Sequence, residues 1–390
     1  MQTKTANVMV DDRKSRGLGM RAIGKAPLAL LGILIAAASS AVCFGQIPGA
    51  NQPDRPIDAP EKSAVIASLA QAIKEGYAFP DVADKLAHML TQNQSNNVYA
   101  KVTSAREFSE LLTRQLADIA NDRHLHVVYS FNVVPKMLMQ EPGDSPLTLD
   151  AQIMQRMQAT QRRNNYAFER VERLSGNVGY LKLNEFSDAA RGGDTVAGAM
   201  AFLANTDALI IDLRENLGGT PMMVQLLASY FFGAEIPVHL NDLSWRQPGS
   251  RSQVVTQWWT VPYLLGKRYV DKAVYILTSR RTFSAAEEFT YDLQALKRAT
   301  VVGETTGGGA NPGGIRRIAD HYTAFIPTGH AINPTTKTNW EGKGIEPDIK
   351  VPKEDALNTA YKSALQGLID GTQDEEQLAA LKQALKQVAP

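Results

Sequence analysis

Strands and helices alternate along the middle of this chain, and that alternation constrains the fold more than any other feature. Residues 208–213 (ALIIDL) and 273–277 (AVYIL) are short apolar runs between polar or turn residues, which is typical of buried strands. Apolar residues three and four apart follow each run and predict helices over 221–232 and 285–297. With a further strand predicted over 176–186, this order predicts crossover units around a mainly parallel sheet, and therefore an α/β fold.

The first 46 residues differ from the rest in composition. An apolar run over 26–42 follows the basic residues Arg13, Lys14, Arg16, Arg21 and Lys25, and it ends among small residues before Gln46. This order predicts a bacterial-type signal peptide, with an uncleaved N-terminal anchor as the alternative. The sole cysteine, Cys43, ends this segment, so we expect an exported body without disulfides. The predicted location is periplasmic or extracellular, with membrane contact only through an uncleaved N-terminal segment.

Four further segments complete the predicted organisation. Residues 47–60 are rich in Pro, Asn, Gln and Asp and predict a linker. Helical spacing predicts a small helical N-terminal domain over 60–122 and a peripheral helical C-terminal segment over 353–390. The alternating strands and helices between them, with the short strands that follow, predict an α/β core over 123–352. Because 41 Lys and Arg balance 40 Asp and Glu, no nucleic-acid-binding surface is predicted.

Ser284 stands between a predicted strand and a predicted helix. Unpaired backbone N–H groups and the helix dipole favour negative charge at that point, which suits a nucleophile. Ser284 and Glu287 also have the spacing of a capping box, and this stretch alone favours a helix cap. The face of the helix opposite its apolar residues is predicted to carry Glu287, Glu288, Asp292 and Lys297.

Two other places could contribute to a site. Asp122-Arg123-His124 offers an imidazole in a strand-like run, and His126 would point the same way. Gly218-Gly219 ends a predicted strand, where glycines let backbone amides face a ligand, as an oxyanion hole requires. Taken singly, each has a structural alternative: a packed histidine and a tight turn. The chain has no H-E-x-x-H and no close group of His and Cys, so neither a metal nor a cofactor is predicted.

Four runs in order, ALIIDLRENLGG, TSRRTFSAAEEF, ATVVGETTGGG and GKGIEPDIKV, resemble those of tail-specific, or carboxy-terminal processing, serine proteases. That family includes the tricorn core protease and the retinoid-binding repeats of the retina, and the likeness covers roughly residues 60–352. It implies a ββα-spiral, crotonase-like core beside a small helical domain. By the same resemblance Ser284 is the nucleophile, and the amides of Gly219 and Ala285 form the oxyanion hole.

The chain departs from the branch of this family that uses a Ser–Lys dyad. Thr305 and Gly309 stand where lysines would be expected, and residues 131–175 are too few for the PDZ domain of that branch. The D-x-H sequence that ends at His124 resembles the tricorn-type arrangement. That resemblance implies His124 as the base, with His126 as the alternative, and Glu304 assisting through a hydrogen-bonded partner.

The resulting prediction is an exported serine endopeptidase that acts on a peptide or protein substrate through an acyl-enzyme on Ser284. The alternative is a non-catalytic binding protein for an apolar ligand or peptide. It stays open because the retinoid-binding relatives share the fold, and a fold does not by itself establish a function.

Overall fold

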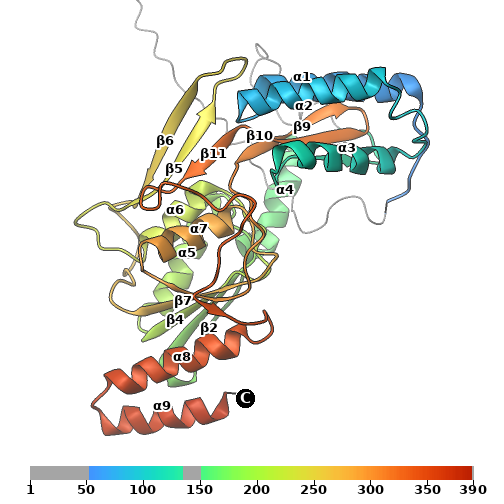
Figure 1. Cartoon of the computed structure of the whole chain (residues 1–390). Coiled ribbons are helices and arrows are strands. Elements are labelled where there is room, and N and C mark those ends of the chain that lie inside the picture. The colour runs from blue at the N-terminus through green and yellow to red at the C-terminus, as the bar shows by residue number, and fades with distance from the viewer. Residues whose placement is uncertain (1–51, 135–150, 389–390) are drawn as a thin grey trace, which may run out of the picture. The chain divides into compact units, whose positions relative to one another are not determined.

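A six-stranded sheet forms the centre of the computed structural model, which describes residues 52–134 and 151–388 (Figure 1). The strand order is β12-β8-β7-β4-β3-β2. The strands are β2 (Phe168–Leu174), β3 (Val178–Leu183), β4 (Ala208–Asp212), β7 (Ala273–Thr278), β8 (Thr300–Gly303) and β12 (Ile349–Lys350). All neighbouring pairs are parallel except β2 with β3, which confirms the predicted mainly parallel sheet.

Different helices cover the two faces of this sheet. Ile211 belongs to a core shared with α5 (Ala189–Leu203), α6 (Pro221–Ser229) and α7 (Ala285–Ala295). Its neighbour Ile210 belongs to a core shared with α8 (Ala356–Gly371) and α9 (Glu375–Gln387). Successive side chains of a strand point to opposite faces, so a sheet covered on both faces needs continuously apolar strands. Because α8 covers one face, it is part of the core packing and not peripheral as expected.

The N-terminal helices share their core with strands from much later in the chain. The predicted helices here are α1 (Ala59–Gly76), α2 (Pro80–Ser95) and α3 (Ala105–Ala120). They pack with a sheet of β1 (His126–Tyr129), β10 (Tyr322–Pro327) and β9 (Gly313–Ala319), in that order. Residues 313–327 thus complete the N-terminal core, and the predicted domain boundary at residue 122 stays a prediction.

A third sheet covers the side of α7 that faces away from the main sheet. It consists of β11 (Gly329–Ile332), β5 (His239–Arg246) and β6 (Gln253–Trp259). Leu243, Ala331 and Trp340 form a small core with Tyr291 of α7. Three of the four polar residues predicted for the face of this helix opposite its apolar residues are therefore covered, and the fourth lies beyond the end of α7. Burial is nearly complete for Glu287, Glu288 and Asp292, whereas Lys297 is exposed.

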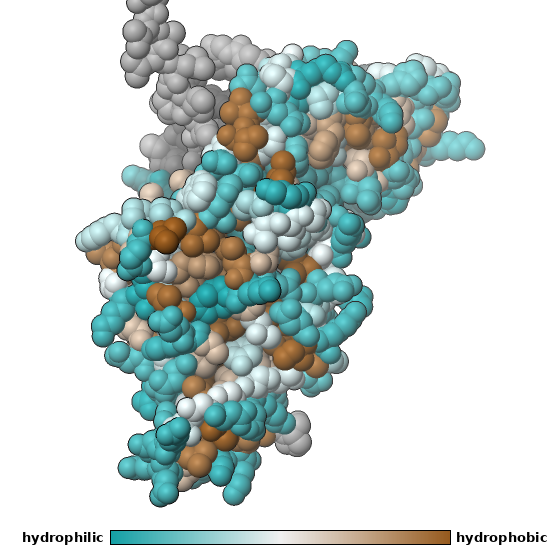
Figure 2. Space-filling view, turned by 60° about the vertical axis from the view of Figure 1, so that its left-hand side comes forward, coloured by the Kyte–Doolittle hydropathy of each residue, from teal (hydrophilic) through white to brown (hydrophobic). Residues whose placement is uncertain are grey.

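The surface in Figure 2 shows apolar residues in separate groups among hydrophilic ones. Ile236, Tyr263 and Leu265 are among the most exposed apolar side chains of the described residues.

None of the helices in the described part of the chain is both long and apolar enough to cross a membrane. The segment over 1–46 that predicts a signal peptide or anchor lies outside the described residues, as does the first part of the linker predicted over 47–60. The helix α4 (Ala151–Arg163) precedes β2.

Candidate active site

Ser284 lies at the junction of β7 and α7, as predicted, and its backbone is strained. Its φ of 53° and ψ of −122° fall in a region that residues other than glycine rarely adopt. Such a conformation costs on the order of 1–3 kcal/mol and persists only where surrounding contacts hold it. A sharp strand-to-helix turn of this kind is how hydrolases expose a nucleophilic serine. Ser284 is the N-cap residue of α7, as the capping-box spacing predicts, and its strained backbone is a feature that a cap alone does not require.

Glu287 binds the start of α7 to the glycine-rich loop after β8. Its carboxylate accepts hydrogen bonds from the Ser284 N–H at 2.9 Å, the Thr306 hydroxyl, the Gly308 N–H at 2.7 Å and the Gly309 N–H at 2.8 Å. Four donors fill the acceptor positions of a carboxylate. Burial raises the pKa of Glu287 to about 7, and these donors oppose the rise. The glycine loop is thereby fixed beside Ser284.

The turn after β4 also lies against Ser284. A Cβ placed on Gly218 would lie 2.7 Å from the Ser284 Cβ, and one on Gly219 would lie 2.0 Å from the Phe186 carbonyl oxygen. Both glycines have positive φ, 118° and 140°. Within the described residues, neither the Gly219 N–H nor the Ala285 N–H has a hydrogen-bond acceptor. Two unengaged amides beside a serine are what an oxyanion hole requires.

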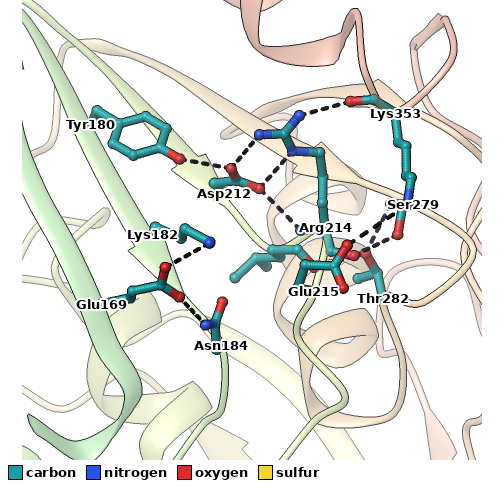
Figure 3. Close-up of polar contacts among 11 residues, drawn as sticks. Glu169, Tyr180, Lys182, Asn184, Asp212, Arg214, Glu215, Ser279, Thr282 and Lys353 are labelled. Atoms are coloured by element: carbon teal, nitrogen blue, oxygen red, sulfur yellow. Dashed lines mark hydrogen bonds and ion pairs between the residues drawn. The ribbon is translucent and has the colours of Figure 1, made fainter. Parts of the chain in front are cut away.

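Polar side chains hold the turn after β4 in place (Figure 3). The Thr282 hydroxyl donates to the Leu213 carbonyl at 2.9 Å, which ties this turn to the one before α7. Arg214 binds both carboxylate oxygens of Asp212, at 2.9 and 2.6 Å, and the Lys353 carbonyl at 2.7 Å. Burial disfavours the Asp212 charge, but the hydrogen bonds from Arg214 keep the pKa of this carboxyl below its ordinary value. The two turns are thus preorganised relative to each other.

Ser284, Gly219 and Ala285 line one small pocket with a volume of about 40 Å³. Glu288 also lines it, and most of the remaining wall is apolar, including Pro221, Leu243, Ala331 and Trp340. Because Ser284 and the two residues with unengaged amides line the same pocket, a carbonyl group bound there would lie beside all three.

His124 contacts two neighbours of Ser284. Its ring centroid lies 4.6 Å from that of Phe283, and a Cβ on Gly309 would lie 2.6 Å from His124 Cε1. The side chain is buried, and its Nδ1 has no hydrogen-bond partner in the described part of the chain. Burial, together with nearby His126, lowers the pKa of His124 to about 3. The imidazole is therefore neutral near pH 7 with a lone pair free to accept a proton, but it needs a nearby negative charge to stabilise the imidazolium that would form.

His126, the alternative base, has different surroundings. It begins β1, its Nδ1 lies 2.6 Å from the His124 carbonyl oxygen, and its ring stacks on Phe325 at 6.0 Å. Of the two imidazoles, His124 is the one that contacts Phe283 beside Ser284. This geometry favours His124 as the base.

Two carboxylates lie close to the His124 ring. A carboxylate oxygen of Asp122, a ring nitrogen of His124 and a carboxylate oxygen of Glu341 all lie within 4.8 Å of one another. Glu341 accepts hydrogen bonds from the N–H groups of Arg123 at 2.9 Å and Ala310 at 2.5 Å. Burial, with the charge of Asp122, raises the pKa of Glu341 to about 7. The spacing would allow a metal ion, but carboxylates that already accept protein N–H groups suit the positioning of an imidazole better.

Two family models match successive parts of the chain. Peptidase family S41 matches residues 177–351, and the N-terminal domain of peptidase S41 in eukaryotic IRBP matches residues 60–168. The chain belongs to peptidase family S41. The family and fold class predicted from the sequence are thereby confirmed.

Two named peptidases are similar to this chain over part of their length. Carboxyl-terminal-processing peptidase 1 of Arabidopsis thaliana is 26% identical over 186 residues, which are 48% of this chain and 36% of the relative. A probable CtpA-like serine protease of Staphylococcus epidermidis is 30% identical over 192 residues, 47% of this chain and 36% of the relative. The match thus spans little more than a third of these relatives.

The crystal structure of a candidate peptidase from Parabacteroides merdae has a similar fold. It is similar with a TM-score of 0.52 at 18% identity, and the match covers 81% of this chain and 98% of that one. At this identity the likeness concerns the fold alone.

Glu304 and Glu341 occupy different places in this S41 site. The Glu304 carboxylate accepts a hydrogen bond from the Arg280 N–H at 3.2 Å, and within the described residues it makes none with His124 or Ser284. The assisting role of Glu304 therefore stays a prediction without a supporting contact. Glu341 was missed, although it directly precedes the GKGIEPDIKV run that carried the resemblance. The position of an acidic residue directly before this run is the sequence feature that could have indicated Glu341 as a site residue.

Proposed function

We propose that this S41 protein is an exported serine endopeptidase that cleaves peptide bonds through an acyl-enzyme on Ser284. One observation carries the proposal: Ser284, in a strained turn, shares a pocket with the unengaged N–H groups of Gly219 and Ala285. These are the nucleophile and the charge-stabilising donors that acyl transfer needs.

Acylation uses the groups that surround this pocket. The Ser284 Oγ attacks the carbonyl carbon of the substrate while its proton passes to the neutral His124 imidazole. The resulting oxyanion accepts hydrogen bonds from the Gly219 and Ala285 amides. The C–N bond then breaks, and the leaving amine takes the proton from His124.

Deacylation repeats these steps with water in place of the serine. His124 takes a proton from water, which attacks the ester carbonyl, and then returns the proton to the Ser284 oxygen as the acid product leaves. Glu341 is a positioning residue here, because its carboxylate is near a ring nitrogen of His124 and is itself held by two backbone N–H groups. It would orient the ring and stabilise the imidazolium that forms in each step.

Export is the second part of the proposal. It is supported by the basic residues and the apolar run over 26–42 within the first 46 residues. Sequencing the N-terminus of protein recovered from a bacterial periplasm would locate the cleavage; an intact Met1 on membrane-bound protein would favour an anchor instead.

Hydrolysis of an internally quenched peptide library tests the enzymatic part of the proposal. Ser284→Ala and His124→Ala should each lower kcat by about 10⁴-fold or more. The matched controls, Ser95→Ala and His88→Ala, change exposed residues and should leave kcat within about twofold. Undiminished hydrolysis by Ser284→Ala would rule out this nucleophile, and peptide binding without any hydrolysis by the wild type would support the binding-protein alternative.

A further inference from the structure

Glu288 is a buried carboxyl that lines the pocket of Ser284. It lies on α7, four residues after the serine, and is 6% exposed. Asn241 of β5 donates a hydrogen bond to Glu288 Oε1 at 3.0 Å. Among the described residues Glu288 Oε2 receives no hydrogen bond and forms no ion pair. A buried carboxylate without a counter-charge is costly, and a cation that enters the pocket would offset that cost.

The surroundings of Glu288 add more acceptors than donors. Asp292, one turn further along α7, is fully buried; its Oδ1 accepts from Asn333, and its Oδ2 has no partner. The Asn241 Oδ1 is also buried without a partner. None of the ion pairs in the described part of the chain includes Glu288 or Asp292. Burial raises the pKa of both acids, and each adds to the other's cost of ionisation. This region therefore lacks a positive charge.

The rest of the pocket suits the hydrocarbon part of a long side chain. Pro221, Leu243 and Ala331 supply apolar wall. The pocket volume of about 40 Å³ is a few times the ~10–15 Å³ of cavity volume that holds one water molecule. It can take a compact ammonium group with the adjacent part of its stem, whereas a planar guanidinium needs more space.

We propose that Glu288 is a specificity-determining residue that selects a lysine side chain on the acyl side of the scissile bond. The proposal rests on the proposed function, because Ser284 and both oxyanion amides share the pocket with Glu288. The residue whose carbonyl occupies those amides is the one whose side chain can reach Glu288. Its ammonium would donate to Glu288 Oε2, and its methylene groups would contact the apolar wall.

Peptide binding to the full-length Ser284→Ala protein tests this without requiring catalysis. Three hexapeptides that differ only in their C-terminal residue, lysine, norleucine or arginine, would be titrated by calorimetry. We expect the lysine peptide to bind about tenfold or more tightly than the norleucine peptide, which has the same stem without the charge, and more tightly than the arginine peptide. Equal affinity for lysine and norleucine would overturn the proposal, and this comparison needs no change at Glu288.

A second substitution assigns the preference to Glu288. Glu288→Gln, added to Ser284→Ala, should reduce the lysine preference to about twofold or less. The matched control is Glu215→Gln, which removes an exposed acid that pairs with Arg281 outside the pocket lining, and it should keep the full preference. A full preference in the Glu288→Gln protein would overturn the proposal.

Hydrolysis separates this proposal from the proposed function. The wild type should cleave after lysine with a kcat/KM about tenfold above that after norleucine. A Glu288-dependent lysine preference in binding, without hydrolysis of any peptide, would contradict the peptidase and keep the lysine site. Hydrolysis with equal kcat/KM for the two residues would keep the peptidase and contradict the lysine site.

Discussion

Gly309 leaves the space that the His124 ring fills. A Cβ on Gly309 would lie 2.6 Å from His124 Cε1 and 2.3 Å from Phe283 Cζ. The same position is where a lysine is expected in the Ser–Lys branch of the family. A larger side chain at residue 309 would overlap the His124 imidazole. The observed position of His124 therefore requires glycine at residue 309.

Gly309→Ala should therefore displace the imidazole. Because misplacement of a catalytic group by about 1 Å can lower a rate about 10²-fold, we expect kcat to fall by that order. Steady-state kinetics on one fluorogenic peptide would measure it. The control is Gly314→Ala, because nothing lies within 4 Å of a Cβ at that position. Equal loss of kcat in both variants would contradict the steric explanation.

Glu341→Gln should lower kcat with little change in KM, because Glu341 lies beside His124 and does not line the pocket of Ser284. A reduction on the order of 10²-fold is expected. Glu304→Gln is the comparison, and with its hydrogen bond at Arg280 it should alter kcat by about twofold or less. If Glu304→Gln were the more damaging change, the sequence-based assignment of Glu304 would be right and the positioning role of Glu341 wrong.

Glu287→Gln should destabilise the protein by about 2–4 kcal/mol. The amide NH₂ would replace one carboxylate oxygen, and it would then face N–H or O–H groups that donate to that oxygen in the wild type. Urea denaturation would measure the free energy of unfolding. Glu107→Gln changes an exposed acid in the same S-x-x-E spacing at the start of α3 and should cost less than about 0.5 kcal/mol. Similar losses in both would mean that Glu287 is an ordinary helix cap.

Stability should fall as pH rises from about 4.5 to about 7, because of the buried acid Glu288 of α7. Burial raises the pKa of Glu288 from 4.5 to about 7, so between these values the folded carboxyl holds a proton that the unfolded one has released. The stabilisation is complete below about pH 4.5 and is lost as pH rises through the folded pKa, by at most about 1.4 kcal/mol per pH unit for one group. The free energy of unfolding of Glu288→Gln should vary less between pH 5 and 8, and an unchanged slope would contradict this.

Local patterns were sufficient for the elements but not for their surroundings. The strand at Ala273 and the helix after Ser284 follow from apolar periodicity, which depends on near neighbours only. The burial of Glu288 and Asp292 depends on β5 and β11, which are distant in sequence and cover α7. Hydropathy along one helix does not contain that information.

The same limit applies to the site itself. Ser284 and Gly219 were predicted from motifs, whereas their contact depends on the packing of Gly218 against Ser284 and of Gly219 against Phe186. The proximity of Glu341 to His124 joins residues more than 200 positions apart, and no spacing rule connects them. Motif order indicates which residues take part, and tertiary packing determines which of them meet.

Labelling with a fluorophosphonate, read by intact-mass spectrometry and peptide mapping, tests the role of Ser284 most directly. The wild type should gain the mass of one adduct, on the peptide that contains Ser284, and Ser284→Ala should gain none. The labelling rate of His124→Ala should be lower by about 10²-fold or more, because the proton acceptor is missing. Labelling that persists in Ser284→Ala, or an adduct on another serine, would contradict Ser284 as the nucleophile.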